Sequence, residues 1–491
     1  MDTSKNTQNI SLRLRFFLLF LAAALCLTVL FRDLDNDIWF LLSHGRHVLE
    51  EGIPTIEPFT IHQGFSFVMQ QWLSATIFYW IYSILGEFGL KVLVYVSYVL
   101  STLIFYRLCL KVSGNQFVQS ILTTYIYVAL VSLFMTSRPF IFTNIILLLE
   151  VYVLESYYLD RNRKILFVLP LLSIVMINVQ AAIWPMLLVV MLPYLIDSFA
   201  FKFGPLVGRG IEKGPLVISV LLIILAGFLN PYGLDAMLYL VNSYGVAEIN
   251  AMVIEMAPAT VSSILGLLIM TVTIGLTFIY AFSKNPNKSL RYTLLALGTT
   301  YLSLSTIRGF LFFISCALFP LVVFMDLDRI PQFDKTKPER TLVIRKILLV
   351  AIAIMLPLTF YSLTRSNNHG QSDRVLFEQL LNQVVADREN EEVILYTGYN
   401  DGGLAEFHRI PTYMDPRAEV FLKKNNLQDD VFAEYYQLQN GQIFYKTVLD
   451  KYGFTHLLVG KGDILYEYLL HDDEYQLGDE NDQYRLFRAA K

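Results

Sequence analysis

The stretch Asp33-Leu34-Asp35-Asn36-Asp37-Ile38-Trp39-Phe40 decides the fold, and it opens a segment that runs on to Gln71-Trp72-Leu73. Three carboxylates stand within five positions, directly after the first apolar run of the chain. Carboxylates are costly to keep in an apolar setting, so charges at the end of a membrane helix are expected to serve a function. We therefore predict that residues 33–72 form the reactive loop of a membrane protein.

The composition is that of a polytopic membrane protein. Of 491 residues, 55% are hydrophobic and only 16% charged, and the mean hydropathy is +0.49. Soluble domains have about 25% charged residues. No basic block is present, which argues against nucleic acid as a partner. Cys26, Cys109 and Cys316 all lie in hydrophobic segments, so no disulfide framework is predicted.

The first apolar run, residues 11–31, follows Lys5 and carries Arg13 and Arg15 near its start. A signal peptide is the alternative, but the run is long enough to span a bilayer and no small-residue cleavage site ends it. We predict a retained first helix that enters from the cytoplasm. Further apolar runs occupy about 88–110, 117–136, 139–158, 165–182, 184–201, 215–230, 261–282, 291–306, 309–326 and 344–364.

The apolar and aromatic stretch 72–85 is too short for an upright span, which needs about 20 residues. If it does not cross, most loop Lys and Arg residues fall on the cytoplasmic side, as the positive-inside rule requires. If it did cross, that bias would be inverted. We therefore predict about eleven spans, with 72–85 as an interfacial juxtamembrane helix of the first outer loop, residues 32–87. The N-terminus is then cytoplasmic.

Residues 366–491 change character, becoming acidic and mixed, and are predicted to form an extracytoplasmic α/β domain after a membrane domain over 1–365. Within this domain the patterns predict a helix over 375–387 and strands over 392–397 and 455–460. A helical stretch over 432–452 should break near Gly441, and residues 475–488 should form a closing hairpin.

The predicted topology places several polar residues from separate helices at one depth, at the outer rim. Arg138 and Arg308 are candidates for binding a phosphate, because Arg offers fixed donors that match its oxygens. Arg138 could instead anchor the helix start before Pro139, and Glu255 could orient an acceptor or simply be exposed. The set of candidate substrate-binding residues is Arg308, Arg138, Glu57, His44, Glu255 and Gln180.

The first outer loop resembles that of the GT-C superfamily of glycosyltransferases, which use polyprenyl-phosphate-linked sugars, in the aminoarabinose-transferase and protein-mannosyltransferase branch. The resemblance rests on an acidic residue, an aromatic, an Arg and a Gly in the order Asp37, Trp39, Arg46 and Gly52. Residues 72–86 resemble the juxtamembrane helix of that branch.

A closer resemblance is to a group of uncharacterised bacterial membrane proteins with GT-C character. Its motifs recur here in the same order, as Asp37-Ile38-Trp39, Gly52-Ile53-Pro54-Thr55-Ile56-Glu57-Pro58-Phe59, Gln71-Trp72-Leu73, Arg138-Pro139, Asn178-Val179-Gln180, Asn230-Pro231-Tyr232-Gly233, Gly402-Gly403 and Asp415-Pro416-Arg417-Ala418-Glu419. The chain departs from the pattern where Gln71 replaces an acid, Gln180 replaces a His and Glu57 replaces an Asp. Acid-base or metal roles of the first two positions therefore do not carry over.

The resemblance implies an inverting transfer of a hexosyl or pentosyl group from a polyprenyl-phosphate carrier to a cell-envelope glycan or lipid acceptor on the outer face. Such a transfer needs a base at the acceptor hydroxyl and positive charge at the departing phosphate. Asp37 is the predicted base and Asp35 the alternative. Asp37 could instead cap the helix that follows. The rival hypothesis is a non-catalytic membrane protein that binds envelope polymer or lipid.

Asp37, His44 and Glu51 recur every seven residues, so a helix over 37–51 would align them. His and carboxylate are good metal ligands. Gly45 is expected to interrupt this helix, however, and the spacing matches no known ligand motif. We therefore predict no metal and no cofactor, with a divalent metal as the less favoured alternative.

Overall fold

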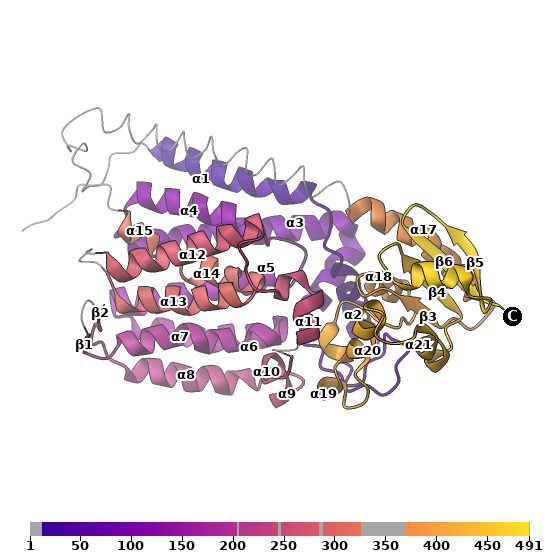
Figure 1. The fold of residues 1–491 in the computed structure, drawn as a ribbon. Coiled ribbons are helices and arrows are strands. Elements are labelled where there is room, and N and C mark those ends of the chain that lie inside the picture. Colours follow the sequence, from indigo (N-terminus) through magenta and orange to yellow (C-terminus); the bar gives the residue numbers. More distant parts are fainter. Residues whose placement is uncertain (1–11, 204–205, 244–246, 284–287, 326–369, 491) are drawn as a thin grey trace, which may run out of the picture.

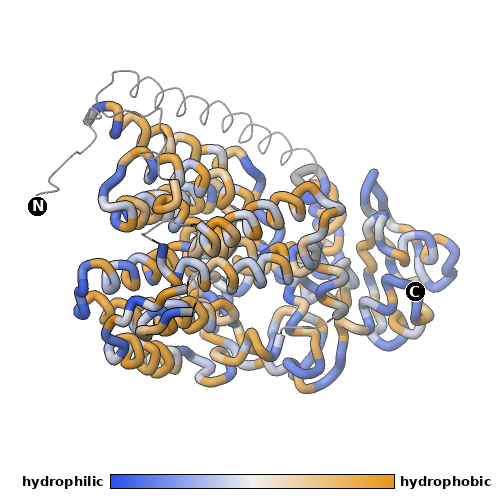
Figure 2. Tube along the Cα trace, turned by 60° about the vertical axis from the view of Figure 1, so that its left-hand side comes forward, coloured by the Kyte–Doolittle hydropathy of each residue, from blue (hydrophilic) through white to orange (hydrophobic). Residues whose placement is uncertain are grey.

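The computed structural model describes residues 12–203, 206–243, 247–283, 288–325 and 370–490. Apolar helices form a bundle, and a smaller domain covers one end of it (Figure 1). Figure 2 shows hydrophobic residues along the bundle and hydrophilic ones concentrated at its ends and in the smaller domain. The bundle helices are α1 (Leu12–Cys26), α3 (Trp72–Val112), α4 (Phe117–Val131), α5 (Phe140–Asp160), α6 (Val168–Val179), α7 (Pro185–Asp197), α8 (Gly214–Gly227), α12 (Ile264–Phe282), α13 (Leu290–Ser305) and α14 (Phe310–Cys316).

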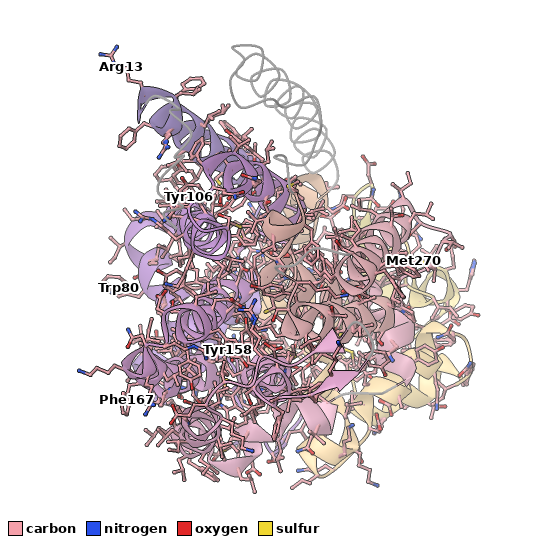
Figure 3. All side chains as sticks on the ribbon, turned by 90° about the vertical axis from the view of Figure 1, so that its left-hand side faces the viewer. Arg13, Trp80, Tyr106, Tyr158, Phe167 and Met270 are labelled. Carbon is pink, nitrogen blue, oxygen red and sulfur yellow. The ribbon has the colours of Figure 1, made fainter. Side chains whose placement is uncertain are left out.

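Four segments of the described chain are long and apolar enough to cross a membrane: Arg13–Phe31, Trp72–Val112, Phe140–Asp160 and Ile264–Phe282. Shorter apolar helices pack between them. Figure 3, which looks along the bundle from the end away from the smaller domain, shows Trp80 and Phe167 at its periphery. Their exposed fractions are 60% and 71%, and large apolar side chains that face outward on such a bundle indicate a lipid-facing surface. The predicted span 344–364 lies outside the described residues, so the number eleven stays a prediction.

Helix α3 is too long for one upright span. It has 41 residues, which is about twice the length that a bilayer core needs. It bends at Gly86, whose φ of 60° and ψ of −154° are accessible to glycine and strained for other residues. The bend separates residues 72–85 from 87–112, so the predicted juxtamembrane helix is a distinct segment that continues into the next span.

Helix α2 (Ile38–Glu50) lies at the end of the bundle, against α3 and against α18 (Gly402–Phe407) of the smaller domain. The expectation that Gly45 interrupts this helix is wrong, because α2 runs through it. A Cβ at Gly45 would stand 2.1 Å from the backbone oxygen of Ala75. The glycine therefore serves the close approach of α2 and α3.

The smaller domain has a four-stranded sheet in the order β3-β4-β6-β5. Its strands are β3 (Leu395–Thr397), β4 (His456–Gly460), β5 (Tyr475–Glu480) and β6 (Tyr484–Ala489). Strands β3 and β4 are parallel, and the other pairs are antiparallel. Helix α17 (Gly370–Asp387) packs on the sheet, while α20 (Val431–Gln439) and α21 (Tyr445–Tyr452) are separated by Gly441. The helices, strands and hairpin that the sequence predicts in this region are thus present.

The first outer loop is part of the core of the smaller domain. Phe65, Phe67 and Met69 of this loop are buried in one apolar cluster with residues of β4 and α20. The backbone N–H of Ile61 also donates to the carbonyl of Thr412 at 3.0 Å. The loop and the smaller domain are therefore folded as one unit above the end of the bundle.

A buried ion cluster joins three helices at the other end. Arg291, at the start of α13, pairs with Glu155 of α5 at 2.7 Å and with Asp197 of α7 at 3.3 Å, and all three side chains are fully buried. Pairing with two carboxylates and with the hydroxyl of Ser289 offsets the cost of burying Arg291.

Candidate active site

Asp35 and Asp37 lie just before α2, at the end of the bundle that faces the smaller domain. Asp35 Oδ1 accepts the backbone N–H of Asp37 at 3.1 Å, which turns the chain into the helix. Asp37 occupies the N-cap position, but its side chain caps no backbone N–H of α2. Its carboxylate is therefore left to interact across the rim, with side chains of other elements.

Arg138 brings the two carboxylates together. It precedes Pro139 at the start of α5, and its guanidinium forms ion pairs with Asp35 Oδ1 at 2.8 Å and with Asp37 Oδ2 at 3.2 Å. Nη1 also donates to Glu255 Oε2 at 2.9 Å. The side chain is 25% exposed, so these pairs are shielded from bulk solvent on most sides.

Arg308 also binds Glu255, with its Nη2 at 2.6 Å from Glu255 Oε2. It lies in the short helix η5 (Ile307–Gly309), and Glu255 lies in η4 (Ile254–Met256). The two turns are held side by side because Ile307 N–H donates to the carbonyl of Ala257 and Ala259 N–H to that of Leu304. Two guanidinium groups from distant parts of the chain thus converge on one oxygen position.

Two cavities meet at this rim. The larger, of about 540 Å³, extends into the smaller domain, and the other, of about 170 Å³, extends toward the bundle. The smaller cavity is lined on the bundle side by apolar residues such as Phe134, Phe140 and Leu311. The side chains that both cavities share include four charged ones, Asp37, Arg138, Glu255 and Arg308.

The pKa values of the rim acids Asp37 and Glu255 are shifted in opposite directions. Burial raises the pKa of Asp37 to about 7, assisted by the charges of Asp35 and Glu255 and opposed by Arg138 and Arg308. For Glu255, burial works in the same upward direction, but the two guanidinium groups prevail and hold its pKa below the ordinary value. Near neutral pH, Asp37 can therefore take up a proton, while Glu255 stays ionised.

No protein-family model matches the chain, and no curated protein matches it in sequence. Solved structures do match its fold. Archaeal oligosaccharyltransferase AglB from Archaeoglobus fulgidus, in complex with an inhibitory peptide and a dolichol-phosphate, superposes with a TM-score of 0.62 at 11% identity, over 91% of this chain and 69% of that one. ArnT from Cupriavidus metallidurans, bound to undecaprenyl phosphate, gives 0.59 at 11% identity, over 97% and 98% of the two chains. Arabinofuranosyltransferase AftD from Mycobacteria gives 0.54 at 12% identity, over 98% of this chain and 40% of that one.

The chain has the GT-C fold. In this fold the segment before α2 places Asp35 and Asp37 at the same end of the bundle as Arg138 and Arg308. At these identities the likeness concerns the fold alone.

Within this GT-C fold, two predicted site residues do not line the cavities themselves but contact Arg417, which lines the smaller one. Glu57 and His44 both contact Arg417, at 2.8 Å and 3.0 Å, in a buried network with Glu406 and Asp415. Neither residue is among those that line the two cavities. Burial, then the charge of Arg417, holds the pKa of His44 well below its usual value, so its neutral ring accepts from the guanidinium. The network joins the first outer loop to the smaller domain.

Gln180 lies on the smaller cavity, where its Oε1 accepts the hydroxyl of Thr143 at 2.8 Å. Asp37, His44 and Glu51, which a helix was expected to align, do not share one site. Asp37 pairs with Arg138, His44 contacts Arg417, and Glu51 pairs with His47 at 3.5 Å. In the described chain, Asp387, Glu391 and His456 are close enough to share a metal ion, but Arg488 Nη2 lies 2.6 Å from Asp387. That group is in the smaller domain, beside the sheet.

Sequence reasoning missed the outer wall of the larger cavity. It comprises the turns 398–401 and 460–463 and the start of β6, with Asp401, Asp463 and Tyr484 among its residues. A signal was available, because both turns follow parallel strands and the carboxyl ends of parallel strands meet at one edge of a sheet.

Proposed function

We propose that the protein is a GT-C glycosyltransferase that moves a sugar from a polyprenyl-phosphate carrier to a cell-envelope acceptor on the extracytoplasmic face. The observation that carries the proposal is the shared position of Asp37 between two cavities, with Arg138 at 3.2 Å and Arg308 facing the same rim. A two-substrate transfer needs a base and an anion site between two binding spaces, and this rim offers both.

In the proposed reaction, the Asp37 carboxylate takes the proton of the acceptor hydroxyl. The hydroxyl oxygen then attacks the anomeric carbon of the donor sugar from the face opposite the phosphate, and the bond between that carbon and the phosphate oxygen breaks. The electron pair leaves with the polyprenyl phosphate. Arg138 and Arg308 stabilise the charge that develops on this leaving group.

The lipid carrier is assigned to the smaller cavity, whose bundle side is apolar. Similar folds support this choice, since one ArnT structure is bound to undecaprenyl phosphate and one AglB structure contains a dolichol-phosphate. Glu255 Oε2, between the two guanidinium groups, marks the place that a phosphate oxygen would take. Donor binding then requires Glu255 to share the arginines or to move aside.

The test is Asp37→Asn, which keeps the shape of the side chain but removes the base. We expect sugar transfer from a synthetic undecaprenyl-phosphate sugar to fall by about 10²-fold or more, because general-base catalysis contributes about 10²–10⁴-fold. The matched control is Asp33→Asn. Asp33 is an acid of the same loop, but its side chain lines a separate small cavity.

Transfer that survives in Asp37→Asn at the wild-type rate would show that Asp37 is not the base, and Asp35→Asn would then be tested. If the wild type binds undecaprenyl phosphate but never consumes the donor sugar, the non-catalytic envelope-binding protein is the better description.

A further inference from the structure

The larger cavity reaches well beyond the rim. From Asp37 it extends to the carboxyl edge of the parallel pair β3 and β4, where Gly460 is paired with Tyr484 in the sheet register. Its volume of about 540 Å³ lies within the range of small-molecule sites, about 300–1,000 Å³. An acceptor bound there would have one end at Asp37 and the rest against the smaller domain.

The balance of charge differs between the two ends of the cavity. Among the described residues that line it, the inner end has two guanidinium groups, Arg138 and Arg308, beside two carboxylates, Asp37 and Glu255. The outer wall has the carboxylates of Asp373, Asp401 and Asp463 and one ammonium group, that of Lys461. Guanidinium groups that can pair with an anion thus line the inner end, whereas the excess of carboxylates on the outer wall repels one.

The outer carboxylates are held in fixed positions. Asp463 accepts the hydroxyl of Tyr396 at 2.7 Å and the backbone N–H of Leu465 at 2.9 Å. Asp401 Oδ1 accepts the hydroxyl of Tyr484 at 3.3 Å, and burial raises the pKa of Asp401 to about 7. Such a carboxyl group can both accept and donate hydrogen bonds, which suits hydroxyl and amino groups.

Aromatic rings provide the other surface. Tyr399, Tyr435 and Tyr484 line the cavity, and each combines an apolar ring with a polar edge. The backbone N–H of Tyr399 donates to the Tyr435 hydroxyl at 3.1 Å, and the Tyr399 hydroxyl donates to the carbonyl of Pro416 at 2.8 Å. Flat apolar faces beside hydrogen-bonding groups match the mixed surface of a sugar ring.

We infer that the outer part of the larger cavity binds the acceptor, and that the acceptor presents a neutral or amine-bearing sugar residue there, not an anionic one. The inference rests on the proposed function, which makes Asp37 the base. It adds the chemical class of the acceptor and names Asp401 and Asp463 as the residues that select it by charge.

The test compares three probes of nearly one size: methyl β-glucoside, methyl β-glucosaminide and methyl β-glucuronide. Binding to the full chain in detergent is measured by ligand-observed NMR at about pH 8, where Asp401 is mostly ionised. Saturating undecaprenyl phosphate is present to occupy the arginines. We expect the glucosaminide and glucoside to bind, and the glucuronide to bind more weakly than either.

Variants locate the selectivity. Asp401→Asn and Asp463→Asn should each reduce the preference for the glucosaminide over the glucuronide by about two- to fivefold, the size expected for one partly exposed charge. Lys461→Gln, at an exposed position that should tolerate the change, should increase that preference. Asp482→Asn is the matched control. Asp482 is an exposed acid next to Gln483 in the chain, and Asp482 itself does not line the cavity.

The inference is overturned if none of the probes binds, if the glucuronide binds as tightly as the glucosaminide, or if the variants at 401, 463 and 461 all leave the preference unchanged. The binding assay needs no turnover. Charge-graded binding without any transfer activity would therefore leave the sugar site standing and remove only the proposed function. Transfer activity without any dependence of binding on probe charge would leave the proposed function standing and remove the assignment of the sugar site.

Discussion

At the scale of single residues, the protonation of Asp37 is the property that matters most. Burial raises its pKa to about 7, and a base works only when deprotonated. We therefore expect kcat/KM for sugar transfer to fall as the pH drops below about 7 and to level off above it. A pH profile of the wild type measures this directly.

Glu255→Gln provides the sharper version of this prediction. The charge of Glu255 contributes to the raised pKa of Asp37, and the Glu255 carboxylate forms ion pairs with Arg138 and Arg308. Removing it should shift the acid limb of the pH profile to lower pH by about one unit. It should also tighten undecaprenyl phosphate binding, by up to about fivefold. Glu474→Gln, an exposed acid of the smaller domain, should leave both quantities unchanged. An acid limb that stays in place would contradict the coupling of Asp37 to Glu255.

At the scale of elements, the close contact between α2 and α3 positions the reactive loop. Gly45→Ala would place a methyl group against the backbone of Ala75, and backbone cannot yield as a flexible side chain can. We expect a loss of about 1–3 kcal/mol in the free energy of unfolding, with a lower melting temperature in detergent. Transfer activity should fall as well, because α2 begins directly after Asp37.

Gly275→Ala is the matched control for Gly45→Ala. Gly275 lies inside the helix α12, and nothing is within 4 Å of the Cβ it would gain. The change should be neutral or slightly stabilising, since Ala favours a helix more than Gly does. Equal melting temperatures for the two variants would show that helix packing does not depend on Gly45.

At the scale of the whole molecule, the Arg417 network holds the first outer loop and the smaller domain together. Arg417→Ala would leave Glu57, Glu406 and Asp415 buried without their cation. We expect a cost of about 3–5 kcal/mol in the free energy of unfolding, together with faster cleavage of the loop in limited proteolysis.

Arg409→Ala tests whether burial accounts for the loss of stability expected of Arg417→Ala. Arg409 also links the same two parts, through Glu50 at 2.8 Å, but its side chain is 60% exposed. Such a surface pair contributes about 1 kcal/mol or less. If both variants lowered the melting temperature equally, burial of the Arg417 network would not account for the stability.

The orientation in the membrane is a second property of the whole molecule. All three cysteines, Cys26, Cys109 and Cys316, are buried, so introduced cysteines can be labelled selectively. We expect a membrane-impermeant maleimide to label Asp482→Cys on intact cells, and Lys164→Cys only after permeabilisation. Both positions are exposed. The reversed pattern would place the smaller domain in the cytoplasm.

The sequence alone predicted much of the architecture, because hydrophobic periodicity and turn residues act locally. Apolar runs predicted the bundle, and Gly441 separated two helices as expected. The predicted topology places Asp37, Arg138, Glu255 and Arg308 at one depth together with other polar residues such as Glu57, since membrane depth constrains residues that are far apart in the chain. The structure brings the first four together and buries Glu57 against Arg417.

Only the tertiary structure decided the contacts. Glu57 and Arg417 are 360 positions apart, and no local pattern indicates that they share a buried network. Gly45 resembles a helix breaker in sequence, and its role depends on a neighbouring helix. The outer wall of the larger cavity exists because the pairing of β3 with β4 brings two turns to one edge. Pairing across long separations depends on packing of the entire chain, so it is the part that local sequence patterns do not determine.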